Sequence, residues 1–189
     1  TGRTRIPAPI DRWFTQPRWS PDGRSVLALI EQSRVINLSR IEVASGKVTP
    51  LTTGLRYDAG FALSKQGRIV VLGGDDVTPY QLAALEQGGL RPLGSHNEWL
   101  AQKKLVRFEN ISFRSADGTS IDGFVVKPPD YVPGHRYPTI LRIHGGPVYQ
   151  FSHEFMPEWQ AFAAAGFAVV AVNPRGSSGR GFEFAKSIF

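Results

Sequence analysis

The sequence contains no cysteine, which excludes disulfide bonds, thiolate catalysis and zinc sites built on cysteine. It also lacks a long hydrophobic run. The longest, at residues 161–172, is interrupted by Gly166 and is far shorter than the roughly 20 residues of a membrane-spanning helix. No apolar stretch follows the polar N-terminus, and position 1 is not a methionine. We therefore expect a chain that begins inside a longer protein and has no membrane partner. The compartment stays open, with the cytoplasm favoured.

The positive charge does not point to nucleic acid. Lysine and arginine exceed aspartate and glutamate by 22 to 16, but they are scattered from Arg3 to Arg180 and form only one small cluster, at residues 103–107. A scattered surplus is typical of solvated surface. The four histidines have no metal-ligand spacing and the HExxH motif is absent. We therefore predict no nucleic-acid partner, no metal and no cofactor.

An internal repeat dominates the first half of the chain. Ser-Pro-Asp-Gly-Arg-Ser-Val-Leu at residues 20–27 aligns with Ser-Lys-Gln-Gly-Arg-Ile-Val-Val at residues 64–71, 44 positions later. A second pair of turn signals, Ser45-Gly46 and Gln87-Gly88, lies 42 positions apart. This period is the length of a four-stranded propeller blade. We interpret residues 1–94 as the last blades of a β-propeller; two unrelated hairpins are the alternative.

The second half has an α/β rhythm. The pattern predicts a linker at residues 95–107 and a hairpin at 108–126. It then predicts a strand at 139–143, a helix at 154–165, a second strand at 167–172 and the opening of another helix at 182–189. Two strands joined by a helix indicate a parallel pair with a right-handed crossover.

A His-Gly-Gly-Pro motif at residues 144–147 follows the strand predicted at 139–143. Ligands bind at such strand ends in open α/β sheets, and a glycine pair lets a backbone N–H approach them. In α/β-hydrolases the loop after the third strand supplies an oxyanion-hole N–H of this kind. A plain tight turn is the alternative.

A glycine-rich loop, Asn-Pro-Arg-Gly-Ser-Ser-Gly-Arg-Gly, occupies residues 173–181. It is not a nucleophile elbow, because Arg180 stands where Ser178 would need a second glycine. It matches neither the dinucleotide-binding nor the Walker pattern. We expect a structural loop at the rim of a cleft, with phosphate binding by Arg175 and Arg180 as the alternative.

Together these motifs resemble the prolyl oligopeptidase family of serine peptidases, and its acylaminoacyl-peptidase and dipeptidyl-peptidase-IV-like branches most. The resemblance rests on Trp-Ser-Pro-Asp-Gly, Ile-Ser-Phe-Arg-Ser-Ala-Asp-Gly-Thr, His-Gly-Gly-Pro, Gly-Phe-Ala-Val-Val and Asn-Pro-Arg-Gly-Ser-Ser-Gly, at residues 19–23, 111–119, 144–147, 166–170 and 173–179. It implies a fold in which the C-terminal blades of a β-propeller are followed by the N-terminal part of an α/β-hydrolase domain. The expected division is residues 1–94, 95–107 as linker, and 108–189.

The resemblance also assigns roles to residues. Gly146 would supply the oxyanion-hole amide, while His144, with Gly145 and Pro147, would be scaffold and not the triad base. Arg175 is a candidate for substrate binding. The nucleophile is expected roughly 20–40 residues beyond Phe189, so this chain would hold no member of the triad.

The sequence therefore predicts that this chain is part of a serine peptidase and contributes its oxyanion-hole loop. Such an enzyme would cleave short peptides through an acyl-enzyme, with a peptide substrate and the remainder of the same protein as partners. A non-peptidase esterase and a non-catalytic propeller interaction module are the alternatives.

Overall fold

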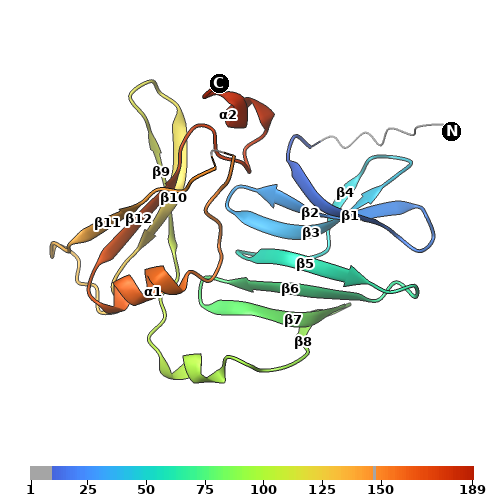
Figure 1. Cartoon of the computed structure of the whole chain (residues 1–189), viewed down its shortest axis with the longest axis horizontal. Coiled ribbons are helices and arrows are strands. Elements are labelled where there is room, and N and C mark those ends of the chain that lie inside the picture. Colours follow the sequence, from blue (N-terminus) through green and yellow to red (C-terminus); the bar gives the residue numbers. More distant parts are fainter. Residues whose placement is uncertain (1–9, 147) are drawn as a thin grey trace.

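The computed structural model describes residues 10–146 and 148–189. They form two β-sheets that lie side by side, an eight-stranded sheet from residues 13–92 and a four-stranded sheet from residues 109–173 (Figure 1). Residues 95–107 connect the two sheets and contain the short 3-10 helix η1 (Glu98–Gln102). Among the described residues, no helix has the length and apolar character needed to cross a bilayer.

The expected fold class, propeller blades followed by part of an α/β-hydrolase domain, is wrong for this molecule. The structure is mostly β, with two open sheets, and within the described residues neither sheet closes. In a propeller each blade is a separate sheet arranged around a channel. Here both repeats belong to one sheet, because β3 pairs in parallel with β5 at Ile36 and Tyr57. The period specifies the length of a four-stranded unit, but not how neighbouring units join.

Each repeat is an antiparallel meander of four strands. The strands are β1 (Trp13–Trp19), β2 (Ser25–Gln32), β3 (Val35–Glu42) and β4 (Val48–Pro50), then β5 (Tyr57–Leu63), β6 (Ile69–Asp75), β7 (Thr78–Glu86) and β8 (Gly89–Pro92). The first turns of the two repeats match. Gly23 N–H donates to Ser20 O (2.9 Å) and Gly67 N–H to Ser64 O (3.0 Å). Both glycines have left-handed φ, +66° and +81°, which only glycine adopts freely.

A buried carboxylate joins the two repeats. Asp58 of β5 is fully buried and accepts a hydrogen bond from the Leu38 N–H of β3 (3.1 Å). It also accepts from the Thr52 hydroxyl and pairs with the Arg56 guanidinium at 2.6 Å. Since the direct ladder between β3 and β5 is a single residue pair, this side chain supplies hydrogen bonds that the backbone does not.

The four-stranded sheet has the order β11-β12-β10-β9. Its strands are β9 (Glu109–Arg114), β10 (Ser120–Val126), β11 (Thr139–Arg142) and β12 (Ala168–Asn173). Helix α1 (Pro157–Ala164) connects β11 to its parallel neighbour β12, as predicted. The helix starts later than predicted because Pro157 occupies its first turn, where a missing N–H costs nothing. A second helix, α2 (Phe182–Lys186), follows.

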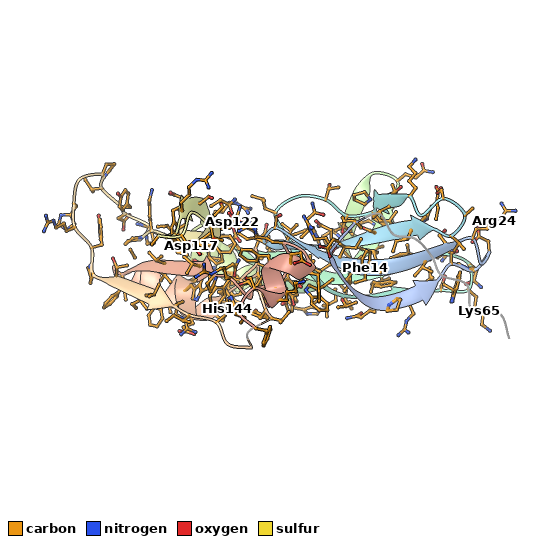
Figure 2. All side chains as sticks on the ribbon, turned by 90° about the horizontal axis from the view of Figure 1, so that it is seen from above. Phe14, Arg24, Lys65, Asp117, Asp122 and His144 are labelled. Atoms are coloured by element: carbon orange, nitrogen blue, oxygen red, sulfur yellow. The ribbon has the colours of Figure 1, made fainter. Side chains whose placement is uncertain are left out.

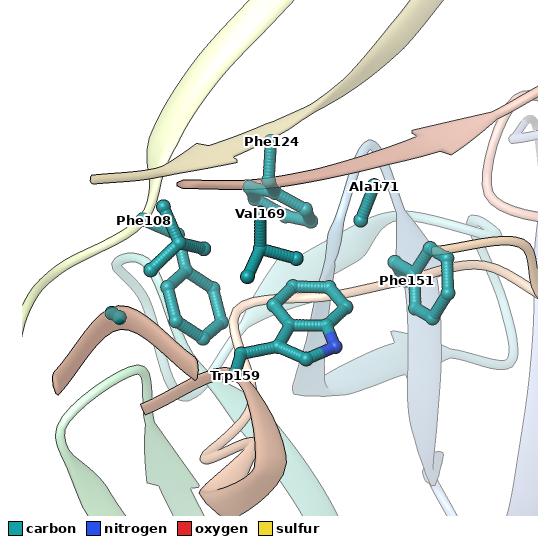
Figure 3. Close-up of a cluster of buried hydrophobic side chains, with 8 residues drawn as sticks. Phe108, Phe124, Phe151, Trp159, Val169 and Ala171 are labelled. Atoms are coloured by element: carbon teal, nitrogen blue, oxygen red, sulfur yellow. The ribbon is translucent and has the colours of Figure 1, made fainter. Parts of the chain in front are cut away.

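An aromatic cluster packs α1 onto this sheet. Trp159 is fully buried, with its ring 5.0 Å from the rings of both Phe108 and Phe151. Figure 3 shows it between these two rings, on the side of the sheet that carries Phe124 and Val169. Phe151 of this cluster also packs against the ring of His144, in the segment that follows β11.

Candidate functional site

The loop after β11 places two glycines at the end of an edge strand. Gly146 has φ +118°, a left-handed conformation that disfavours any other residue. Space is not the limit, because a Cβ there would meet Tyr149 Cβ at an ordinary 3.5 Å. Gly145 and Gly146 are both exposed, and no described residue accepts a hydrogen bond from the N–H of either. The loop therefore holds backbone donors available to a ligand.

The His144 side chain anchors this loop. Its Nδ1 lies 3.1 Å from Gly145 O, which can only accept, so Nδ1 is the donor in this contact, and Nε2 lies 2.9 Å from the Ser177 hydroxyl. The ring packs edge-to-face on Tyr149 and Phe151, with centroids 5.5 and 5.2 Å away. In Figure 2 His144 lies in the half of the molecule formed by the four-stranded sheet, far from Arg24 and Lys65.

The Ser177–His144 contact is not a catalytic dyad. Ser177 is fully buried and Ser178 is 3% exposed, so neither hydroxyl meets a substrate. Their loop is instead tied to the segment after His144. The Ser178 N–H donates to Tyr149 O at 3.1 Å. The structural role expected for residues 173–181 therefore agrees with their geometry.

Asn173 opens the motif at residues 173–179, but the sequence analysis assigns it no role. At the end of β12 its Oδ1 accepts from the Phe151 N–H (2.7 Å) and its Nδ2 donates to Phe151 O (3.0 Å). Both residues are buried. The signals in the sequence were its place in that motif and its position as a polar residue at the end of an apolar strand. This pair holds Phe151 against the ring of His144.

Arg175 is the remaining predicted site residue that the structure describes. Arg175 forms an ion pair with Asp117 in the β9–β10 turn, and its side chain is about half exposed. A substrate contact of Arg175 stays a prediction. Pro147 lies outside the described residues.

A group of tyrosine and glutamate side chains borders the anchor on the side of the eight-stranded sheet. The Tyr80 hydroxyl donates to Glu154, and the rings of Tyr57 and Tyr80 stack at 5.7 Å. Burial, reinforced by Glu154, Tyr149 and Glu31, raises the pKa of Tyr57 to about 12. Burial also raises the pKa of the Glu31 carboxyl. The tyrosine hydroxyls are thus kept protonated beside the loop.

Comparisons with known proteins point to peptidases. A family model described as "Prolyl oligopeptidase family" matches residues 153–188. The chain is 31% identical over 183 residues to the uncharacterized peptidase YuxL of Bacillus subtilis, covering 92% of this chain and 27% of that protein. The chain belongs to the prolyl oligopeptidase family. The resemblance seen in the sequence is confirmed.

Other relatives and solved structures extend the likeness. Dipeptidyl-peptidase 5 of Aspergillus fumigatus is 28% identical over 93% of this chain and 26% of its own length. The solved structure of an acylaminoacyl peptidase in complex with Z-Gly-Gly-Phe-chloromethyl ketone aligns with a TM-score of 0.81 at 29% identity. That of Pyrococcus horikoshii acylaminoacyl peptidase gives 0.81 at 28%. They cover 93% and 94% of this chain and 27% of each solved chain. This chain spans about a quarter of the length of these family members.

Proposed function

We propose that this chain contributes the oxyanion-hole loop of a serine peptidase that hydrolyses short peptides through an acyl-enzyme. The observation that carries the proposal is Gly146, which is exposed, has a left-handed φ, and has an N–H with no described acceptor. Membership of the prolyl oligopeptidase family and relatives named as peptidases support it.

The chemistry that this loop offers is electrostatic. When a serine attacks a peptide carbonyl, negative charge develops on the carbonyl oxygen. A backbone N–H held in place stabilises that charge without reorganising during the reaction. The His144–Ser177 hydrogen bond and the ring packing of His144 hold the loop fixed, which is the property an oxyanion donor needs.

The proposal requires a nucleophile and a base from elsewhere in the complete protein. The 189 residues contain no G-x-S-x-G motif. Among the described strands, β11 has a partner on one edge only, and Leu141 and Ile143 near its end are 59% and 73% exposed. This edge gives further chain a place to pair directly beside the Gly146 loop. The peptide substrate and that further chain are the partners we propose.

The test is Gly146→Val in the complete protein. The β-branched side chain disfavours φ +118° and turns the amide away, so kcat on a peptide substrate should fall by about 100- to 1,000-fold with a smaller change in KM. Steady-state kinetics on matched peptide and ester substrates measure this, and also separate a peptidase from an esterase. Covalent labelling with a fluorophosphonate should succeed with the complete protein and fail with the 189-residue chain alone.

Two control variants sharpen this test. Gly134→Ala places the same kind of left-handed strain (φ +84°) in a distant loop, where a Cβ meets nothing within 4 Å. Gly145→Ala adds a methyl beside Gly146 without a left-handed φ and without a close contact. Both should lose far less activity than Gly146→Val. A folded Gly146→Val enzyme with near-normal kcat on peptides would show that the loop is structural only.

A further inference from the structure

Two hairpin tips of the eight-stranded sheet converge on one segment beside the candidate site. The first tip joins β2 to β3 through Ser33 and Arg34, both with left-handed φ (+46° and +72°). Arg34 O accepts from the His153 N–H at 2.8 Å. The Gln150 side chain accepts from the Arg34 N–H at 3.2 Å. This tip therefore forms hydrogen bonds with residues 150–153, one to the backbone of His153 and one to the amide side chain of Gln150.

The second tip, between β6 and β7, reaches the same segment through Asp76. Its carboxylate oxygens lie 2.9 and 3.1 Å from His153 Nδ1, and one of them accepts from the Phe108 N–H at 3.1 Å. Its backbone carbonyl accepts from the Gln160 side chain of α1 at 2.9 Å. His153 and Asp76 are each only 1% exposed. A buried carboxylate needs such partners, because an unpaired buried charge is strongly unfavourable.

On its other side, the His153 ring contacts the four-stranded sheet. Its Nε2 lies 3.2 Å from Asn110 Oδ1 of β9, and its ring packs edge-to-face on Phe124 of β10 at 4.9 Å. One side chain thus contacts a hairpin tip of one sheet and two strands of the other. His153 is therefore one of the points at which the two sheets are fixed to each other, together with the Arg34–Asp122 ion pair.

The path from this point to the Gly146 loop is short. Phe151, two residues before His153, packs on the ring of His144 at 5.2 Å and is held by Asn173. Tyr149 packs on the same ring and accepts the Ser178 N–H. A displacement of His153 would therefore move Phe151, two residues away along the backbone, and with it the ring of His144 that anchors the Gly146 loop.

We propose that the buried Asp76–His153 pair is a positioning clamp, through which the eight-stranded sheet sets the geometry of the His144–Gly146 loop. His153 is a positioning residue here, since it is buried and acts through Phe151 and His144. The kinetic consequence rests on the proposed function of this loop; the mechanical link between the sheets does not.

The test compares His153→Gln with His153→Asn in the complete protein. An asparagine amide places its NH2 where His153 has Nδ1, so it keeps a donor to Asp76. A glutamine amide places its NH2 near the position of Nε2, so it keeps the Asn110 contact and loses Asp76. His135→Gln, at an exposed histidine in the loop before β11, is the matched control.

Amide hydrogen exchange of peptides covering residues 144–152 measures whether the Asp76–His153 clamp holds this segment. Steady-state kinetics measure the effect of the clamp on kcat. We expect His153→Gln to raise exchange there and to lower kcat by about 10- to 100-fold, with KM within about threefold. His153→Asn should recover most of both losses, and His135→Gln should change neither. Unchanged exchange at 144–152 in folded His153→Gln protein overturns the clamp. Raised exchange with unchanged kcat overturns its positioning role.

The two hypotheses fail in different ways. If the wild-type protein hydrolyses no peptide, the proposed function is wrong, while the exchange comparison still decides whether the clamp exists. If His153→Gln does not fold, His153→Asn decides instead. A stable, active His153→Asn protein with normal exchange at residues 144–152 supports the clamp. A folded His153→Asn protein that keeps the Asp76 contact but shows raised exchange or lost activity overturns it.

Discussion

The two sheets bury different kinds of core. The eight-stranded sheet packs aliphatic side chains from neighbouring strands of its meanders, chiefly Leu27, Leu29, Leu38 and Val71. The four-stranded sheet packs aromatic rings that come from a connection, a strand and a helix far apart in the sequence. The first core follows from local hairpins and shows as a repeat in the sequence. The second depends on long-range contacts, and it supports the candidate site.

The largest effect is expected in the aromatic core. Trp159→Ala should lower the free energy of unfolding by about 3–5 kcal/mol, because the cavity lies among rings that cannot collapse into it. Trp159→Phe should cost much less. It keeps an aromatic ring and removes an indole N–H that has no partner among the described residues. Urea unfolding of both variants gives the comparison; equal losses would contradict the role of the ring.

A smaller effect is expected at the joint of the repeats. Asp58→Ala removes the acceptor of the Thr52 hydroxyl, leaves the Leu38 N–H with Thr52 Oγ1 alone, and takes away the partner of Arg56, so we expect a loss of about 2–3 kcal/mol. Asp58→Asn keeps an acceptor for Leu38 and should lose roughly half as much. Thermal unfolding monitored by circular dichroism measures both. An Asp58→Ala protein as stable as wild type would show that the single Ile36–Tyr57 bridge suffices.

The smallest loss of stability is expected at a turn that occurs in both sheets. The Ser-x-x-Gly turn of both repeats recurs between β9 and β10, where Gly118 N–H donates to Ser115 O (2.8 Å) at φ +83°. A Cβ at Gly23, Gly67 or Gly118 meets nothing within 4 Å, so each alanine variant should cost only its backbone strain, about 1–2 kcal/mol. Denaturant midpoints of the three variants test this, and clearly unequal values would show that the turns differ in context.

The sequence was informative where structure is local. The repeats, their turns, the β11–α1–β12 unit and the family could all be predicted from short motifs and their spacing. The joining of both repeats into one open sheet could not be predicted, because it depends on which strands pair across repeats, and the β3–β5 bridge involves one residue pair. The helix boundary was missed by three residues at Pro157.

The supports of the candidate site were the least predictable part. In the sequence, Asp76 has the pattern of a turn residue, and His153 is one of four histidines without a shared spacing. They meet 77 positions apart, a distance at which no periodicity connects them. Gly146 was identifiable because its motif lies at the end of a strand. The clamp beneath it was not, since it is made by hairpin tips of the other sheet.

The joint between the repeats also has a consequence for the order of folding. Nearly all backbone pairing in the eight-stranded sheet is between adjacent strands of one meander, whose loops are short and close quickly. The two meanders can therefore form independently, and the carboxylate of Asp58 reaches Leu38 only once both exist. We therefore expect the joint to form late, so that its strength governs how fast the finished sheet unfolds more than how fast it assembles.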